Sequence, residues 1–136
     1  MADFVDTSVL VEALVEGAAH HAACAAALRD AEMTASHCLV ETFSILTGGR
    51  LGFRVPAEAA AKLIRYHTTG LHLVTLSGPE TLGLLAKAKT AGVRGGAIYD
   101  FLILEAARQA DASRVLTLNL KDFMPLARGL VVMAPS

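Results

Sequence analysis

The sequence lacks the features that mark several classes of protein. It has no tryptophan and only 18% charged residues, with twelve basic against thirteen acidic side chains and a net charge of −1. This balance excludes a general basic coat for nucleic acid, so any such contact needs a local patch. Apolar runs such as 22–28 and 130–134 are much shorter than the roughly 20 residues that span a bilayer.

The chain has only two cysteines, Cys24 and Cys38, without the paired spacing of a disulfide scaffold or a structural zinc site. We therefore expect both thiols to be reduced and buried. The first ten residues carry two aspartates and no basic stretch, which is unlike a secretory signal. Together these features predict a cytoplasmic protein.

A length of 136 residues suits one domain, which we predict to cover residues 1–136. Hydrophobic residues make up 54% of the chain, which is more than a small core needs. The surplus indicates that a second copy or another protein covers part of the surface. We therefore expect a homodimer or a protein partner.

Short apolar runs alternate with helical periods along the whole chain. We expect strands near 4–6, 33–35, 71–76, 114–117 and 130–134, and helices near 10–17, 20–29, 39–48, 56–69, 77–91 and 98–110. The helix at 77–91 begins with a capping-box signature, Ser77-Gly-Pro-Glu80. Strands that alternate with helices predict an α/β fold, a three-layer α/β/α domain with a central, mostly parallel five-stranded sheet.

Acidic side chains follow several of these strands or begin the helices beyond them. Asp6 follows the first strand, Glu41 and Asp100 lie in early helical turns, and Asn119 and Asp122 follow the fourth strand. Ligands of open α/β sheets collect at the carboxyl ends of the strands. We therefore expect these side chains to meet at one edge of the sheet.

Carboxylates that share one pocket repel each other, so at least one should have a raised pKa when no cation is bound. Oxygen ligands without histidine or cysteine suit Mg²⁺ or Mn²⁺. Such an ion can lower the pKa of a water and offset charge on the leaving oxygen of a phosphodiester. The constellation therefore indicates a metal-dependent phosphodiesterase.

Each acidic residue also has a purely structural interpretation. Asp6 can be a helix N-cap, Glu41 and Asp100 can favour their helix N-termini, and Asp122 can be a turn residue. Only their coincidence at one sheet edge favours a function. Four further acids are expected on solvated helix faces or ends without a role: Glu12, Glu16, Glu105 and Asp111.

Four segments carry a resemblance to a known family: FVDTSVLVE at 4–12, VETFSIL at 40–46, GGAIYDFLI at 95–103 and LTLNLKDF at 116–123. In this order and spacing they resemble PIN-domain ribonucleases, and among these the VapC-type toxins of bacterial toxin–antitoxin pairs. The likeness covers nearly the whole chain. It implies a PIN-like fold, an Mg²⁺- or Mn²⁺-dependent endoribonuclease activity, an RNA substrate, a dimer and a cognate antitoxin.

The resemblance also implies roles for individual residues. Asp6, Glu41 and Asp100 match the family's principal acidic positions, with Asp6 and Asp100 as metal ligands, and Asp122 is the candidate for a fourth catalytic acid. Ser8 matches a supporting hydroxyl, and Thr117 and Asn119 lie in the last motif. The chain departs from the family at Asn119, where an aspartate is common, because an amide offers a carbonyl oxygen but no charge.

An RNA substrate requires positive charge beside the site. Arg94, just before Asp100, and Lys121 are the candidates, followed by Arg50 and Arg54. With two tyrosines, five phenylalanines and no tryptophan, we expect no stacking platform for bases. The five histidines are scattered and predict neither a metal pair nor a catalytic triad.

Two other functions stay open. The altered motif at Asn119 is compatible with a non-catalytic module of the same fold that binds RNA or protein. A phosphatase-like domain with Asp6 as its nucleophile is the third hypothesis, although such enzymes need a second aspartate where this chain has Ser8.

Overall fold

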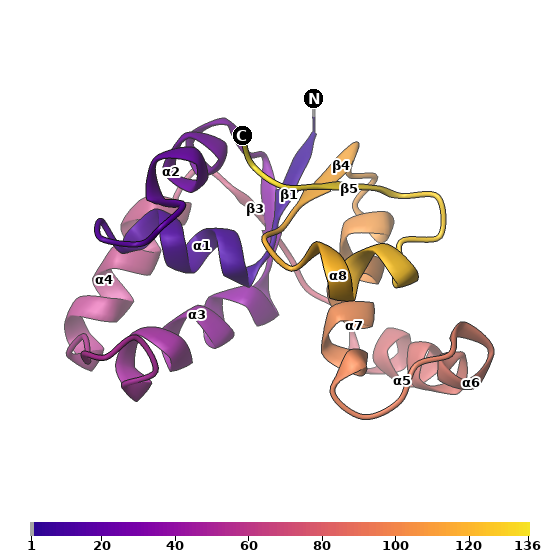
Figure 1. Cartoon of the computed structure of the whole chain (residues 1–136). Helices are drawn as coiled ribbons and strands as arrows, with labels where there is room; N and C mark the ends of the chain where they lie inside the picture. The colour runs from indigo at the N-terminus through magenta and orange to yellow at the C-terminus, as the bar shows by residue number, and fades with distance from the viewer. Residues whose placement is uncertain (1) are drawn as a thin grey trace.

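A parallel β-sheet divides the computed structural model, which describes residues 2–136 (Figure 1). Its five strands lie in the order β3-β2-β1-β4-β5, and every neighbouring pair is parallel. The prediction of a mostly parallel five-stranded sheet is therefore confirmed. The strands are β1 (Asp3–Val5), β2 (Met33–Ala35), β3 (His72–Val74), β4 (Arg114–Leu116) and β5 (Val131–Met133).

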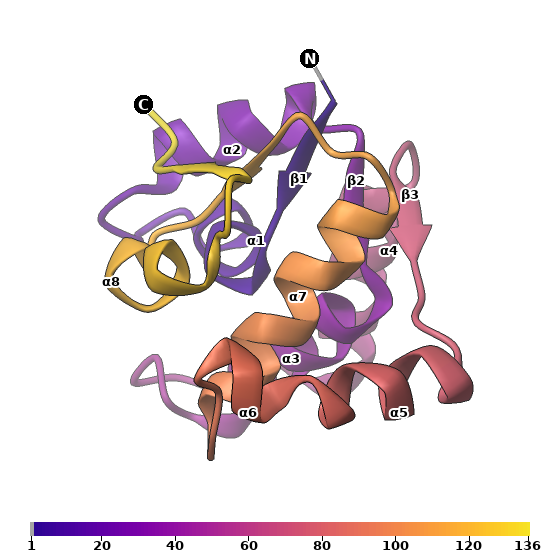
Figure 2. The same cartoon turned by 90° about the vertical axis from the view of Figure 1, so that its right-hand side faces the viewer.

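Helices cover both faces of the sheet, as the three-layer prediction requires. Figure 1 shows α1 to α4 on one side and α5 to α8 on the other. Figure 2 shows α7 lying across its side of the sheet, with α5 and α6 near one end of α7. The helices are α1 (Thr7–Leu14), α2 (His21–Asp30), α3 (Ser36–Gly48), α4 (Ala57–Thr68), α5 (Gly78–Ala86), α6 (Ala88–Ala91), α7 (Ala97–Gln109) and α8 (Leu120–Phe123), followed by a 3₁₀ turn, η1 (Met124–Leu126).

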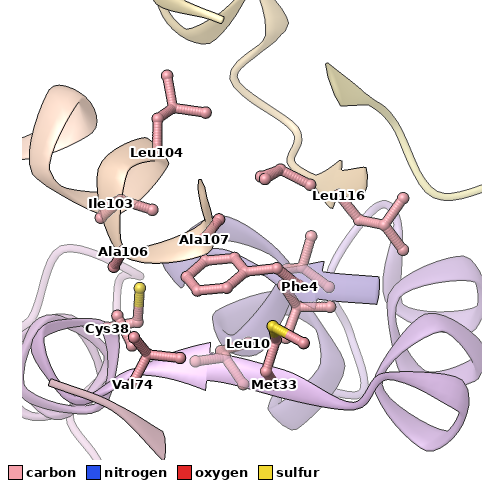
Figure 3. Close-up of a cluster of buried hydrophobic side chains, with 14 of the residues drawn as sticks. Phe4, Leu10, Met33, Cys38, Val74, Ile103, Leu104, Ala106, Ala107 and Leu116 are labelled. Carbon is pink, nitrogen blue, oxygen red and sulfur yellow. The ribbon is translucent and has the colours of Figure 1, made fainter. Parts of the chain in front are cut away.

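The central strand β1 is short but wholly buried, since helices pack on both of its faces. Phe4 has no exposed surface, and Figure 3 shows it among apolar side chains from β2, β4 and α7, including Met33, Leu116 and Ala107. Arg114 ties β4 to β1 through two hydrogen bonds to the Asp3 carboxylate, at 2.7 and 3.1 Å. The core thus fixes the position of β1 and of Asp6, the residue that follows it.

The helix expected at 77–91 is interrupted, which is a correction to the prediction. Lys87 has φ −89° and ψ −6°, and its N–H bonds to the carbonyls of Leu84 and Leu85. This geometry ends α5, and the chain begins a new short helix, α6, at Ala88. No proline or glycine lies at the break. The helix ends through a tight last turn, in which the Lys87 N–H bonds to the carbonyl of Leu84, three residues earlier.

The remaining differences lie at segment ends and after β4. The first helix begins at Thr7 and ends at Leu14, three residues before Gly17. Asp122, for which a turn was the structural interpretation, lies in α8. In the described part of the chain, no helix is long and apolar enough to cross a membrane.

The capping box at Ser77 is formed as the sequence predicts. The Glu80 N–H donates to Ser77 Oγ at 3.1 Å, and the Ser77 N–H donates to Glu80 Oε1 at 2.8 Å. We expect Ser77→Ala to lower the free energy of unfolding by about 1 kcal/mol, because an N–H of α5 loses its acceptor. Urea denaturation measures this loss, and Ser77→Thr, which keeps a hydroxyl, is the matched control. Equal losses in both variants would contradict the role of the cap.

Candidate active site

Asp6 lies where β1 ends and α1 begins, and only 1% of its surface is exposed. Its Oδ1 accepts hydrogen bonds from Ser8 Oγ at 2.6 Å and from the Val9 N–H at 3.3 Å. Its Oδ2 accepts from Thr117 Oγ1 at 2.8 Å. The carboxylate is therefore the N-cap of α1 and is also tied to the end of β4.

The two hydroxyls that hold Asp6 are held in turn by the backbone after β4. Ser8 Oγ accepts from the Leu118 N–H at 2.9 Å, and Thr117 Oγ1 accepts from the Asn119 N–H at 3.0 Å. Ser8 and Thr117 thus have the environment expected of supporting residues. They fix the position of Asp6 relative to the segment that begins α8.

Asp6 opens onto a cleft of about 460 Å³ between α1, α3, α7 and the segment after β4. Two further predicted acids, Glu41 of α3 and Asp100 of α7, line the same cleft, together with Asn119. The topology therefore brings together residues from four separate segments, as the sequence suggested. Figure 1 shows the helices that contribute these walls, α1 and α3 on one side and α7 on the other.

Asp122 lies apart from this group. It is an exposed residue of α8 and is not among the described residues that line the cleft. Its charge is nevertheless close enough to raise the pKa of Asp100. At the fourth position, the structure thus places Asn119 in the cleft and Asp122 beside it.

Burial and charge repulsion raise the pKa of both central carboxylates, in agreement with the expectation from sequence. Burial raises the pKa of Asp6 to about 6 against the opposing hydrogen bonds from Ser8 and Thr117, and the Asp100 charge adds to the rise. Burial also raises the pKa of Asp100 to about 6, with further contributions from Asp122 and Glu41. The cleft is thus a place where negative charge is held at a cost in free energy.

Glu41 is oriented by two residues that sequence reasoning missed. Its Oε1 accepts from Thr7 Oγ1 at 2.9 Å and lies 3.4 Å from His37 Nε2. The His37 ring is also stacked on Tyr99, and the two ring planes lie within 3° of each other. The signal for His37 was available, because it precedes Glu41 by four residues on one helix face.

Glu12 was expected on a solvated helix face or end without a role. Glu12 lines the same cleft. Its Oε1 accepts from the His20 N–H at 2.7 Å, and its carbonyl lies 2.9 Å from His21 Nδ1. Because the chain folds back after α1, the Glu12 side chain is contacted by His20 and is only 26% exposed.

Of the basic side chains predicted to contact RNA, the two preferred candidates do not line the cleft. Arg94, in the loop between α6 and α7, and Lys121 of α8 are both exposed, and neither is among the described residues that line the cleft. Arg50, after α3, is a lining residue. The structure therefore places one basic side chain in the wall of the cleft, and it is not one of the two preferred candidates.

The donor chemistry of the cleft fits a divalent cation. Among residues 2–136, no three acidic, histidine or cysteine side chains already converge closely enough to form a metal site. The cleft nevertheless offers oxygen donors from Asp6, Asp100 and Glu41 and the Asn119 amide, which are ligands that Mg²⁺ and Mn²⁺ prefer. A cation between the carboxylates would also offset the repulsion that raises their pKa values.

A sequence model of the PIN domain matches residues 4–124, which include every acidic residue of the cleft. The chain belongs to the PIN-domain family. The recognition of this family from the four sequence segments is thereby confirmed.

Relatives within this family are VapC proteins. Ribonuclease VapC27 of Mycobacterium tuberculosis is 35% identical over 108 residues, which cover 77% of this chain and 76% of the relative. The sarcin–ricin loop cleaving toxin VapC20 of Mycobacterium tuberculosis superposes with a TM-score of 0.72 at 20% identity, covering 96% of this chain and 97% of VapC20. VapBC2 from Rickettsia felis, solved with a DNA fragment from its promoter, superposes with a TM-score of 0.66 at 18% identity, covering both chains completely. These two structures confirm the predicted PIN-like fold.

The buried charge of Asp6 predicts an unusual dependence of stability on pH. The folded-state pKa, about 6, lies above the ordinary value of 3.8. Protonation of Asp6 therefore contributes to the free energy of unfolding in full below pH 3.8, and this contribution is lost as the pH rises through 6. Ionised Asp6 should therefore cost the metal-free protein up to about 3 kcal/mol above this range.

We expect Asp6→Asn to be more stable than the parent at pH 8 in EDTA, with the difference shrinking toward pH 4. Urea denaturation across this pH range measures the effect. Asp111→Asn is the matched control, because Asp111 is exposed. Parallel pH profiles for the parent and Asp6→Asn would show that Asp6 is not the strained group.

Proposed function

We propose that this chain is a metal-dependent endoribonuclease that acts as the toxin of a type II toxin–antitoxin system. The observation that carries the proposal is the cleft itself, in which Asp6 and Asp100 are held close enough for the Asp100 charge to raise the pKa of Asp6. The name of the 35% identical relative, Ribonuclease VapC27, supports the ribonuclease activity. The acidic cleft supports the requirement for a cation.

In this proposal Asp6 and Asp100 hold Mg²⁺ or Mn²⁺. When bound, the ion lowers the pKa of a water and offsets charge on the leaving oxygen of the phosphodiester. Ser8 and Thr117 keep both oxygens of Asp6 in place through their hydroxyls. Glu41, which accepts a hydrogen bond from Thr7, would orient the attacking water and accept its proton, and Asn119 and Asp122 would complete the polar surroundings.

We also propose a homodimer and a cognate antitoxin as partners. The structural relative VapBC2 is named as a pair of VapB with VapC, which supports an antitoxin partner for this chain. Several large apolar side chains are exposed in this chain and are available for such contacts, among them Val40, Tyr66, Leu82 and Met124. The free, buried thiols Cys24 and Cys38 suit the reducing cytoplasm, where such a pair would act.

Cleavage of a mixed single-stranded RNA pool tests the activity. With Mg²⁺ or Mn²⁺ the wild type should cut some of the RNA, and EDTA should abolish cutting. Asp6→Asn and Asp100→Asn should each lower the rate by a factor of about 100 or more, because each removes a charge that holds the ion. Asp111→Asn should cut like the wild type, and equal cleavage by all four proteins would refute the proposed site.

The RNA-binding part of the proposal predicts different effects at Arg94 and Lys121. A phosphate contact by Arg94 should make Arg94→Ala bind RNA more weakly at low salt and reduce the slope of log Kd against log salt by about one. Lys121→Ala and Arg50→Ala, measured beside it, rank the three basic side chains. Unchanged RNA affinity and turnover in Arg94→Ala would remove Arg94 from the interface.

A non-catalytic binding module is the second candidate, favoured by the uncharged Asn119 at the cleft. The melting temperature with and without Mg²⁺ separates the two, since an ion that binds only the folded state must raise it. The phosphatase-like alternative is disfavoured, because Ser8 stands where such enzymes need a second aspartate and its hydroxyl instead donates a hydrogen bond to Asp6.

A further inference from the structure

Two aromatic rings meet beside Glu41, one of the acids that line the cleft. The ring centroids of His37 and Tyr99 are 5.7 Å apart, and their planes lie within 3° of parallel. This is the separation of an offset stack. His37 lies in the first turn of α3 and Tyr99 in the first turn of α7, so the pair bridges the two helices that supply Glu41 and Asp100.

The stack lies beside the acids in sequence and in space. His37 Nε2 is 3.4 Å from Glu41 Oε1, and Tyr99 directly precedes Asp100 in α7. A group that rests on these rings is therefore next to whatever occupies the cleft. The rings flank the acidic part of the site on the side where α3 and α7 approach.

Both rings are open to solvent. Tyr99 is 53% exposed, and the His37 side chain is 44% exposed. The stack thus leaves much of its aromatic surface uncovered, although α7 buries the ring of Phe101 only two residues further along. An exposed aromatic face is suited to a planar ligand that brings its own π-surface. This departs from the expectation of no stacking platform, because composition alone does not show that two rings from separate helices meet.

An apolar cavity continues from the stack. It has a volume of about 280 Å³ and is lined by His37, Leu76, Leu102 and Ile103, among others. Ile103 also lines the acidic cleft, so this one side chain separates the two spaces. The apolar wall and the rings together form a surface that prefers a flat, weakly polar group.

We propose that Tyr99, stacked on His37, is a specificity-determining platform that binds an unpaired RNA base next to the phosphodiester in the acidic cleft. The inference rests on the proposed ribonuclease function and names how its substrate is held. RNA is the occupant that fits both parts, because its phosphate belongs with a cation in the cleft and its base offers a π-face to the rings. Since every base has such a face, the platform selects for single-stranded RNA and does not select for one particular base.

Binding of a single-stranded RNA oligonucleotide, followed by fluorescence anisotropy in an Asp6→Asn background that prevents cleavage, tests the platform. Tyr99→Leu should raise Kd by about 5- to 150-fold, the range expected for loss of one base–aromatic stack. Tyr99→Phe, which keeps the ring, should stay close to the parent. Tyr66→Leu is the matched control, because it changes the only other tyrosine, which lies on α4.

A second readout distinguishes stacking from a loss of structure. Oligonucleotides with an abasic site moved along the strand should show one position where removal of the base weakens binding to the parent. The same abasic site should cost little in Tyr99→Leu, because the contact is already lost. An unchanged Kd in Tyr99→Leu, or an equal abasic penalty in both proteins, would overturn the platform.

The activity assay separates this inference from the function on which it rests. Wild-type cleavage together with an unchanged Kd in Tyr99→Leu would overturn only the platform. No metal-dependent cleavage by the wild type, together with the expected loss in Tyr99→Leu, would overturn the nuclease and support base binding by the rings. No metal-dependent cleavage by the wild type, together with an unchanged Kd in Tyr99→Leu, would overturn both the nuclease and the platform.

Discussion

The buried carboxylate of Asp6 is the group on which the arrangement of the site depends. It ends the central strand, caps α1 and receives hydroxyl hydrogen bonds from Ser8 and Thr117. Through Thr117 and Ser8 it also fixes the backbone after β4. One side chain thus connects the first strand, the first helix and the segment that leads into α8.

When Asp6 is ionised, this connection places a negative charge where the neutral carboxyl would leave the fold more stable. The hydrogen bonds from Ser8 and Thr117 favour the ionised carboxylate, yet burial outweighs them and its pKa is raised. The pKa of Asp100 is raised in the same direction by burial and by the negative charges of Asp122 and Glu41. A cation in the cleft would offset this repulsion, and the carboxylates would have to move closer together to share it, since no three acidic, histidine or cysteine side chains of residues 2–136 converge on one point.

The general plan of the fold could be predicted because it follows from local patterns. Strands such as Met33–Ala35 are apolar runs bounded by helical periods, and the capping box at Ser77 is a purely local signal. The acids could be assigned to one sheet edge for the same reason, since parallel strands share a direction. The break at Lys87 could not be predicted, because it depends on how the last turn of α5 closes and on no residue type.

The details of the site depended on contacts between distant segments, which periodicity does not report. Glu12 looked like a solvated helix residue because the fold-back of the chain onto it at His20 has no local signature. The stack of His37 on Tyr99 joins the first turns of two helices that are remote in sequence. In each case the sequence showed the residue type, and only the tertiary structure showed which residue it contacts.

The strand order has a consequence for how the charged cleft comes into existence. The chain starts at the centre of the sheet, builds outward through β2 and β3, and then crosses to the other side for β4 and β5. The first half supplies Asp6 and Glu41, and the second half supplies Asp100 and Asn119. A growing chain on the ribosome therefore carries only part of the repulsion, and the full cluster of charge is assembled only after α7 and β4 have docked on the earlier strands.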